Sequence, residues 1–386
     1  MLVVPSAKRA GGGDVWLESL LAGLVTHGIE TTVVFEEHGE LLSHATRCGH
    51  ATAVLDAAVG SQPGGLRRLA EPLASLIGSD RPQVTVFWSP RAQVYGAAAH
   101  RMAGRPGRTA WVQHVMPSRF WLHRAASEAP SDLVICVSRA VQARQEELYP
   151  WCRTAVVCPG LSMPAGVLSR SAARSALGHE GGTLIGVVGR IEPWKGQDIA
   201  VQMLAALPAG IGSLALIGER RSAIWPEFAD HVETLARNLG VSADVIFAGH
   251  VREAAAYLRA LDVLVCASRE EGFGLAALEA MAGGVPVVAT RCGGPEDLVE
   301  HEVTGLLTAP EDPAALARAV RRVLADPDLA GRVTAGAKLL HRRQFTSGAT
   351  ATRFAAVLTH LADGPQAERW LPGGSVVGHQ LQFLCR

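Results

Sequence analysis

Lysine is nearly absent from this chain, since only three of its 36 Lys and Arg residues are lysines, namely Lys8, Lys195 and Lys338. Asp and Glu also number 36, so the formal net charge at pH 7 is zero. Proteins that bind nucleic acid usually carry a basic excess that pairs with the phosphates. We therefore expect no nucleic-acid partner, and the rarity of lysine makes each one worth a functional explanation.

Long apolar runs and paired cysteines are also lacking. No segment approaches the roughly 20 apolar residues of a transmembrane helix, and the apolar start Leu2-Val3-Val4 is too short for a signal-peptide core. The seven cysteines are scattered without a CxxC pair, and several fall in apolar runs such as residues 133–137. Such a pattern is typical of reduced, buried thiols. We expect a cytoplasmic protein without disulfides or structural zinc.

What the chain does contain is an alternation of short β-branched runs with helical patterns. Its 386 residues exceed what one hydrophobic core usually supports. Strands are predicted at residues 2–5, 31–35, 51–55, 84–88, 110–113, 133–137 and 155–157, and then at 184–188, 214–217, 245–248, 263–266, 285–289 and 305–307. Helical patterns fall between them, for example at 15–27, 225–239 and 275–282. This alternation predicts an α/β protein with parallel sheets.

Composition also indicates the domain boundaries. Residues 159–182 are rich in Pro, Gly, Ser and Ala and are typical of a linker followed by a short helix. We predict a first domain over residues 1–165, a second over 166–345, a further helix over 346–362, and a loose tail over 363–386, where helix formers are few.

The segment from Gly189 to Gly196 directly follows a predicted strand and carries Arg190 and Lys195. Parallel sheets bind ligands at the carboxyl ends of their strands. Arginine offers a planar fork for phosphate oxygens and lysine a compact charge. The GxxxxGK[ST] order of a Walker loop is absent. The segment predicts a phosphate-binding loop of another kind, and the alternative is a solvated surface loop.

A second segment runs from Glu271 to Glu279 and also follows a predicted strand. Its glycines permit close backbone approach, and the helix that follows favours an anion at its N-terminus. Placed on one helix, the two glutamates would lie about 80° apart and about 12 Å along the axis, so both could face one extended ligand. Carboxylates accept hydrogen bonds from the hydroxyl groups of sugars and ribose.

These two segments, together with residues 282–289 and 293–296, resemble the family 4 glycosyltransferases of the GT-B fold. The resemblance is specific over about residues 184–310 and looser over 1–160. It implies an α/β fold of two facing Rossmann-like domains, with a C-terminal helix that crosses back to the first. The second domain would hold a nucleotide-sugar donor, and the first would hold the acceptor.

The resemblance also implies roles for residues of the second domain. Arg190 and Lys195 would neutralise the donor diphosphate. Glu271 would bind the transferred sugar, and Glu279 the ribose. Further donor contacts, largely through the backbone, are expected at Gly189, Phe273, Gly274 and Leu275. Arg190, Lys195 and Glu271 count as catalytic residues in this interpretation. Arg220 would either reach the diphosphate or be solvated.

In the first domain the resemblance indicates a glycine loop and a histidine. Gly13, in the loop 11–14, would approach the donor, and Asp14 would lie on the acceptor side, although an ordinary turn is the alternative. His114 would face the transferred sugar as a catalytic residue, while a lone histidine is more often structural. Arg119 and Arg124 lie among aromatic residues and would bind an anionic acceptor, contact a membrane surface peripherally, or form a solvated rim.

One departure concerns the last strand of the first domain. The family often shows Pro-Asn-Gly-Val-Asp there, whereas this chain has Pro159-Gly160-Leu161-Ser162, which puts a hinge contact in doubt.

The mechanism implied is a retaining, metal-independent hexosyl transfer. No DxD-like metal clamp or well-placed nucleophile stands out, so we expect no metal and no cofactor beyond the donor co-substrate. A UDP-sugar is favoured, with GDP-mannose next. The acceptor would be a small metabolite, a natural-product scaffold or a lipid carrier. The alternatives are a nucleotide-sugar epimerase of the same fold and a catalytically silent nucleotide-sugar-binding protein.

Overall fold

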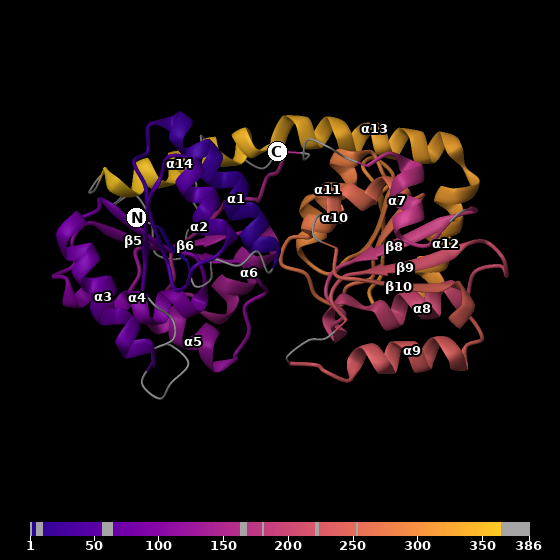
Figure 1. Cartoon of the computed structure of the whole chain (residues 1–386), viewed down its shortest axis with the longest axis horizontal. Helices are drawn as coiled ribbons and strands as arrows, with labels where there is room; N and C mark the ends of the chain where they lie inside the picture. The colour runs from indigo at the N-terminus through magenta and orange to yellow at the C-terminus, as the bar shows by residue number, and fades with distance from the viewer. Residues whose placement is uncertain are drawn as a thin grey trace. The chain divides into compact units, whose positions relative to one another are not determined.

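The computed structural model describes residues 2–4, 11–55, 65–162, 168–179, 181–220, 224–251 and 254–363. Lys8 and nearly all of the expected tail lie outside these residues. The chain divides into two compact units, one of residues up to Gly160 together with those from Thr346 on, and the other of Leu161–Phe345 (Figure 1). Each unit is built around its own sheet.

The sheet of the first unit has seven parallel strands. They are β1 (Leu2–Val4), β2 (Thr32–Phe35), β3 (Ala51–Val54), β4 (Val84–Phe87), β5 (Arg108–Gln113), β6 (Leu133–Cys136) and β7 (Thr154–Val156). Their order is β3-β2-β1-β4-β5-β6-β7, so the chain reverses direction across the sheet between β1 and β4. Such a switch point leaves a ligand crevice outside the strand ends. The loops after β4 and β5 lie at this edge.

Helices connect these strands. They are α1 (Gly12–Leu24), η1 (Val25–His27), α2 (Glu40–Arg47), α3 (Gly65–Asp80), α4 (Pro90–Met102), α5 (Trp121–Glu128) and α6 (Arg139–Leu148). Helix α1 begins three residues before the predicted start, because the Gly11 N–H donates to Asp14 Oδ2 at 3.0 Å and completes the first turn.

The second unit repeats the architecture with six parallel strands. They are β8 (Leu184–Val188), β9 (Ser213–Ile217), β10 (Val245–Gly249), β11 (Val263–Cys266), β12 (Val287–Thr290) and β13 (Leu306–Thr308), in the order β10-β9-β8-β11-β12-β13. Strand β12 begins after Pro286 because proline cannot donate a hydrogen bond to the ladder. The switch point lies between β8 and β11, whose following loops contain the two segments with Lys195 and Glu271.

The helices of the second unit are α7 (Arg170–Ala176), η3 (Pro193–Lys195), α8 (Gln197–Ala205), α9 (Phe228–Asn238), η4 (Ser242–Asp244), α10 (Ala254–Tyr257), η5 (Leu258–Ala260), α11 (Leu275–Gly283), η6 (Gly294–Asp297), α12 (Pro313–Ala325) and α13 (Pro327–Gln344). Buried strand residues such as Ile185 and Val263 form one core with Leu316 and Val320 of α12. The predicted α/β fold with two parallel Rossmann-like sheets is confirmed.

The last described helix, α14 (Ser347–Ala362), belongs to the first unit, as expected. Thr350 Oγ1 donates to Cys158 O at 2.7 Å, and the Ser19 and Ser347 hydroxyls of α1 and α14 lie 2.5 Å apart. At the altered hinge, Leu161 N donates to Phe345 O at 2.9 Å. The hydrogen bond between the segments of Leu161 and Phe345 therefore forms without the Asn and Asp that the family often has at this hinge.

The contact between α1 and α14 can be tested at Gly23, where α1 lies against Ala351 of α14. A Cβ at this position would lie 2.4 Å from the Ala351 Cβ, whereas a Cβ at Gly78 of α3 would meet nothing within 4 Å. Gly23→Ala should therefore lower the free energy of unfolding by about 1–3 kcal/mol through overpacking. Gly78→Ala should raise it by about 0.4–1 kcal/mol. Urea unfolding of both variants checks this, and similar changes in stability would contradict the packing.

Candidate active site

The loop after β8 is shaped by its own hydrogen bonds and by Gly196. Gln197 Nε2 donates to Arg190 O at 2.8 Å, and Glu192 N donates to Gln197 Oε1 at 3.3 Å. Gly196 has a φ of 67°, and a Cβ there would lie 2.1 Å from Ala267 O. Only glycine fits this position without a shift of the backbone. The loop therefore has a defined shape, which argues against a merely solvated segment.

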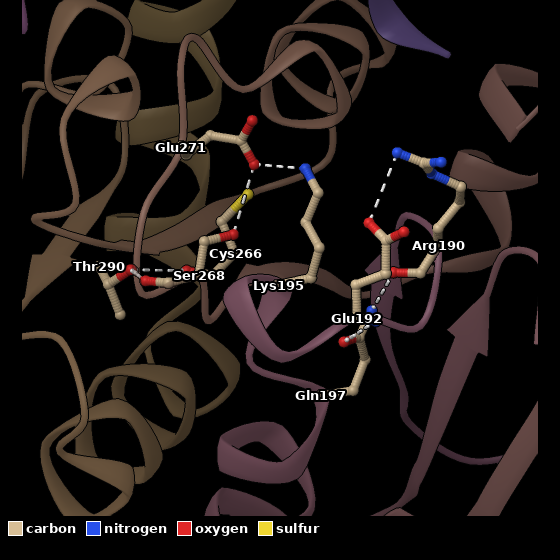
Figure 2. Close-up of polar contacts among 8 residues, drawn as sticks. All are labelled: Arg190, Glu192, Lys195, Gln197, Cys266, Ser268, Glu271 and Thr290. Carbon is tan, nitrogen blue, oxygen red and sulfur yellow. Dashed lines mark hydrogen bonds and ion pairs between the residues drawn. The ribbon is translucent and has the colours of Figure 1, made fainter. Parts of the chain in front are cut away.

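Both cations of this loop lie beside carboxylates (Figure 2). Lys195 Nζ is 2.5 Å from Glu271 Oε2, and Arg190 Nη2 is 3.5 Å from Glu192 Oε2. The Arg190 side chain is 55 % exposed, whereas that of Glu192 is only 1 % exposed. In Figure 2 both cations extend in the same direction from the loop, with Lys195 between Glu271 and Arg190. The structure thus brings together three of the expected catalytic residues at the switch point.

Lys195 is charged at neutral pH. Burial alone would lower its pKa, but the carboxylate of Glu271 outweighs this effect through its charge and hydrogen bond, so that the pKa of Lys195 is raised above the ordinary value. The site therefore contains a fixed ammonium group, which suits a phosphate ligand.

Glu271 lies in an extended segment after β11, not on a helix. Its N–H donates to Cys292 O at 3.0 Å, and Gly294 N donates to its carbonyl at 2.8 Å, which forms a single parallel bridge. Its Oε2 also accepts a hydrogen bond of 3.4 Å from Ser268 Oγ, and Thr290 Oγ1 donates to Ser268 O at 2.5 Å. The backbone of Glu271 is therefore fixed, and its carboxylate lies beside Ser268 and Lys195.

The helical spacing assumed for Glu271 and Glu279 is wrong. Helix α11 begins only at Leu275, with Gly274 as its N-cap. The bridge to Gly293 keeps Glu271 extended, so the estimate of 80° and 12 Å does not describe this pair. Glu279 lies about one turn into α11 and is half-buried. The two glutamates therefore lie on different backbone elements, Glu271 in an extended segment and Glu279 on a helix.

Of the remaining residues expected to contact the donor, Phe273 can offer only its backbone. The Phe273 ring is buried and lies 6.0 Å from the Phe345 ring, so its side chain belongs to the core. Gly189 follows β8 directly, and Leu275 is the first residue of α11 and half-buried. These positions lie at the same strand-end edge as Lys195.

In the first unit the structure brings Gly13, Trp88 and His114 together. Trp88 Nε1 donates to Gly13 O at 3.2 Å, and His114 Nε2 lies 2.9 Å from Trp88 O. A Cβ at Gly13 would lie 3.2 Å from His114 Nδ1, so this position needs a small residue. Trp88, which ends a predicted strand, was not among the expected site residues, although a large aromatic residue at a strand end was a usable signal.

An aromatic cluster surrounds His114. Its ring centroid lies 5.1 Å from that of Trp88 and 5.6 Å from that of Trp16, and both tryptophans also contact Phe354 of α14. Burial among these groups lowers the pKa of His114 to about 4, although the hydrogen bond to Trp88 acts in the opposite direction. The imidazole is therefore neutral at pH 7. Because Nε2 faces a carbonyl, Nε2 carries the proton and Nδ1 is an acceptor.

Of the weaker expected residues, Asp14, Arg124 and Arg220 bind groups of their own unit. Asp14 caps the start of α1. Arg124 Nε donates to Glu128 Oε1 at 2.7 Å along α5, as in a solvated helix pair, while Arg119 is exposed. Arg220 binds Asp230 and Glu233 and lies 5.0 Å over the Phe247 ring, which favours its structural interpretation.

The part of the chain that the structure describes shows neither a metal-ligand cluster nor a membrane-spanning helix. No cluster of three or more His, Cys, Asp or Glu side chains among them is arranged to hold a metal ion. Within the same residues, every helix is too short or too polar to span a lipid bilayer.

Comparisons with known proteins agree with this geometry. The family described as Glycosyl transferases group 1 matches residues 169–339, and the family described as Glycosyltransferase Family 4 matches residues 10–163. D-inositol 3-phosphate glycosyltransferase of Xylanimonas cellulosilytica is 30 % identical over 88 % of this chain and 89 % of its own length. Lipopolysaccharide core biosynthesis mannosyltransferase LpcC of Rhizobium leguminosarum is 37 % identical over 40 % of this chain and 45 % of its own.

Solved structures resemble the fold as a whole. Anabaena Alr3699/HepE in complex with UDP-glucose has a TM-score of 0.80 and 23 % identity, with 93 % of this chain and 99 % of that chain covered. Sucrose-phosphate synthase from Thermosynechococcus elongatus has a TM-score of 0.78 and 22 % identity, with 94 % and 99 % covered. Together with the sequence matches, they confirm the resemblance stated above.

The low pKa of His114 makes a testable prediction about stability. The folded-state pKa of about 4 lies below the ordinary value of 6.5. The contribution of His114 to the free energy of unfolding is therefore constant above about pH 6.5. As the pH falls toward 4, the unfolded chain binds a proton that the folded chain does not, and stability falls by about 3 kcal/mol. His114→Gln should lack this component, so the difference in unfolding free energy between wild type and variant should shrink between pH 7 and pH 4. NMR titration of His114 near pH 6.5 would contradict this.

Proposed function

Because the chain belongs to the group 1 glycosyl transferases of glycosyltransferase family 4, we propose that it transfers a hexosyl group from a UDP-sugar to an acceptor hydroxyl, with retention of configuration and without a metal ion. The observation that carries this proposal is the pairing of Lys195 with Glu271 at the switch point of the second sheet, beside Arg190. A UDP donor is supported by the fold likeness to a protein solved with UDP-glucose. A mannosyl donor comes next, because one relative is named a mannosyltransferase.

The two cations would stabilise the leaving diphosphate. Lys195 and Arg190 supply two positive charges at one edge, and such fixed charges act where negative charge develops in the transition state. A diphosphate that engages Lys195 would compete with Glu271 for the ammonium. Glu271 Oε2 would then be released to accept a hydrogen bond from a hydroxyl of the transferred sugar. Diphosphate binding and sugar recognition would be coupled in this way.

Retention would follow from attack on the same face. The acceptor oxygen would bond to the anomeric carbon while the carbon–oxygen bond to the diphosphate breaks, and the hydroxyl proton would pass to a phosphate oxygen. His114 is unsuited to be a general base at neutral pH because its pKa is about 4. Its neutral Nδ1 would instead accept a hydrogen bond from the transferred sugar.

The acceptor is proposed from the names of relatives. Several of them are D-inositol 3-phosphate glycosyltransferases, so a phosphorylated polyol is the first acceptor to test. Arg119 is an exposed cation in the segment after His114 and would meet such a phosphate, while Asp14 and Arg124 are engaged as described above. A natural-product scaffold or a lipid carrier is the alternative, with peripheral membrane contact in the latter case. The expected cytoplasmic location is part of this proposal.

The proposal predicts a donor preference that survives chelation. In a panel of UDP-, GDP-, ADP- and dTDP-sugars, a UDP-sugar should give the largest thermal stabilisation, about 2.7 kcal/mol at 100 times its dissociation constant. Transfer to inositol phosphate, measured through the UDP that is released, should continue in excess EDTA. Arg190 and Lys195 would supply the positive charge that stabilises the leaving diphosphate. A rate that collapses on chelation and returns with magnesium would contradict the metal-independent mechanism.

The proposed positions of the two glutamates predict different kinetic effects. Glu279 would contact the ribose, which does not change during the reaction, so Glu279→Gln should weaken UDP and donor binding alike. Glu271 would contact the transferred sugar, so Glu271→Gln should slow transfer at least about tenfold, since a charge-assisted hydrogen bond is worth about 1.5–3 kcal/mol. It should not weaken UDP binding, because it removes the carboxylate charge that competes with the diphosphate for Lys195. Calorimetry with UDP and steady-state rates measure both. An equal loss of UDP affinity in the two variants would overturn the assignment.

A further inference from the structure

We propose that Arg269 is a positioning residue that keeps Lys195 and Glu271 in the arrangement needed for the donor, an inference that rests on the proposed role of Lys195 in diphosphate binding. Arg269 lies in the loop after β11, two residues before Glu271. It was not among the residues expected from the sequence.

Arg269 binds the two residues that precede Lys195. Its backbone N–H donates to Trp194 O at 2.8 Å, and its Nη1 donates to Pro193 O at 2.6 Å. Main chain and side chain of one residue thus hold the same short turn, η3. The loop with Glu271 and the loop with Lys195 are joined through these bonds.

The other side of the guanidinium group is anchored to α8. Nη1 and Nη2 bind Asp198 Oδ1 and Oδ2 at 2.9 and 2.7 Å, which is a bidentate pair with a buried carboxylate. Nε donates to Glu311 Oε1 at 3.0 Å. The hydrogen bond with Asp198 is the largest cause that raises the pKa of Arg269 still further above its ordinary value. Arg269 therefore stays charged, and its planar fork fixes geometry as well as charge.

This network matters because the two loops lie beyond the strands that align them. Strands β8 and β11 pair at Ile185–Val263 and Gly186–Leu264, whereas Lys195 lies seven positions after β8 ends at Val188. A displacement of about 1 Å in such a group can cost about 100-fold in rate. Because its guanidinium group binds Pro193, Asp198 and Glu311, Arg269 acts through Lys195 and is not itself a diphosphate ligand.

A double-mutant cycle tests the inference. The dissociation constant of UDP is measured by calorimetry for the full-length wild type, Arg269→Ala, Lys195→Ala and the double variant. We expect Arg269→Ala to weaken UDP binding at least about tenfold in the wild-type background and less than about twofold in the Lys195→Ala background, because groups that share one network are not additive. Asp198→Asn, which keeps the volume and removes one side of the clamp, should give the same pattern with a smaller effect and replaces Arg269→Ala if that variant does not fold.

Arg174 is the matched control. In the same unit its Nη2 binds Asp262 Oδ2 at 2.6 Å and its Nε donates to Ala260 O at 2.9 Å, so it is also a carboxylate- and carbonyl-bound arginine, but it anchors α7. Arg174→Ala should lower the melting temperature while UDP affinity changes less than about twofold in either background.

The outcomes separate the inference from the proposed function. An effect of Arg269→Ala that is equally large in both backgrounds, or no larger than that of Arg174→Ala, overturns the positioning role alone. If Lys195→Ala leaves UDP affinity unchanged, the proposed donor role of Lys195 fails, and the inference fails with it.

Discussion

The ion pair between Lys195 and Glu271 is the interaction on which the candidate site depends. It joins the loop after β8 to the loop after β11 at the point where the strand order of the second sheet reverses. Partly buried charges are costly unless they are paired, and removal of one partner leaves the other uncompensated. The pair therefore requires that both loops be held in place, which Gly196, Gln197 and the bonds of Arg269 achieve on one side and the bridge of Glu271 to Gly293 on the other.

In the first unit, burial and not a neighbouring charge sets the protonation state of the candidate residue His114. His114 is kept neutral by its surroundings, and its tautomer is set by one backbone carbonyl. The aromatic groups around it come from α1, from the residue after β4 and from α14, so the last described helix takes part in the environment of a residue more than 200 positions earlier. The packing of α14 on α1 is thus connected to the candidate site as well as to stability.

Local sequence patterns predicted much of the fold and part of the candidate site. Cations directly after a β-branched run predict a strand-end loop, and the structure places Arg190 and Lys195 there. The prediction that Glu271 and Glu279 share one helix was wrong. Hydrogen bonds to residues 292–294, which are distant in sequence, keep Glu271 extended. Arg269 was overlooked because arginine is abundant in this chain, and only its contacts distinguish it. The cluster of Trp16, Trp88 and Phe354 depends on long-range packing that no local pattern contains.

Charge balance connects these features with the proposed chemistry. In the second unit each expected cation lies beside a carboxylate, Lys195 beside Glu271 and Arg190 beside the buried Glu192. The two pairs together are neutral, so a diphosphate can gain full attraction only by competing with a carboxylate for its cation. Glu192 is buried and cannot readily turn to a ligand, whereas Glu271 lies in a loop at the strand-end edge, beside Ser268. The competition should therefore be resolved at Lys195, and Glu271 is the carboxylate that becomes available to the hydroxyl groups of the donor sugar.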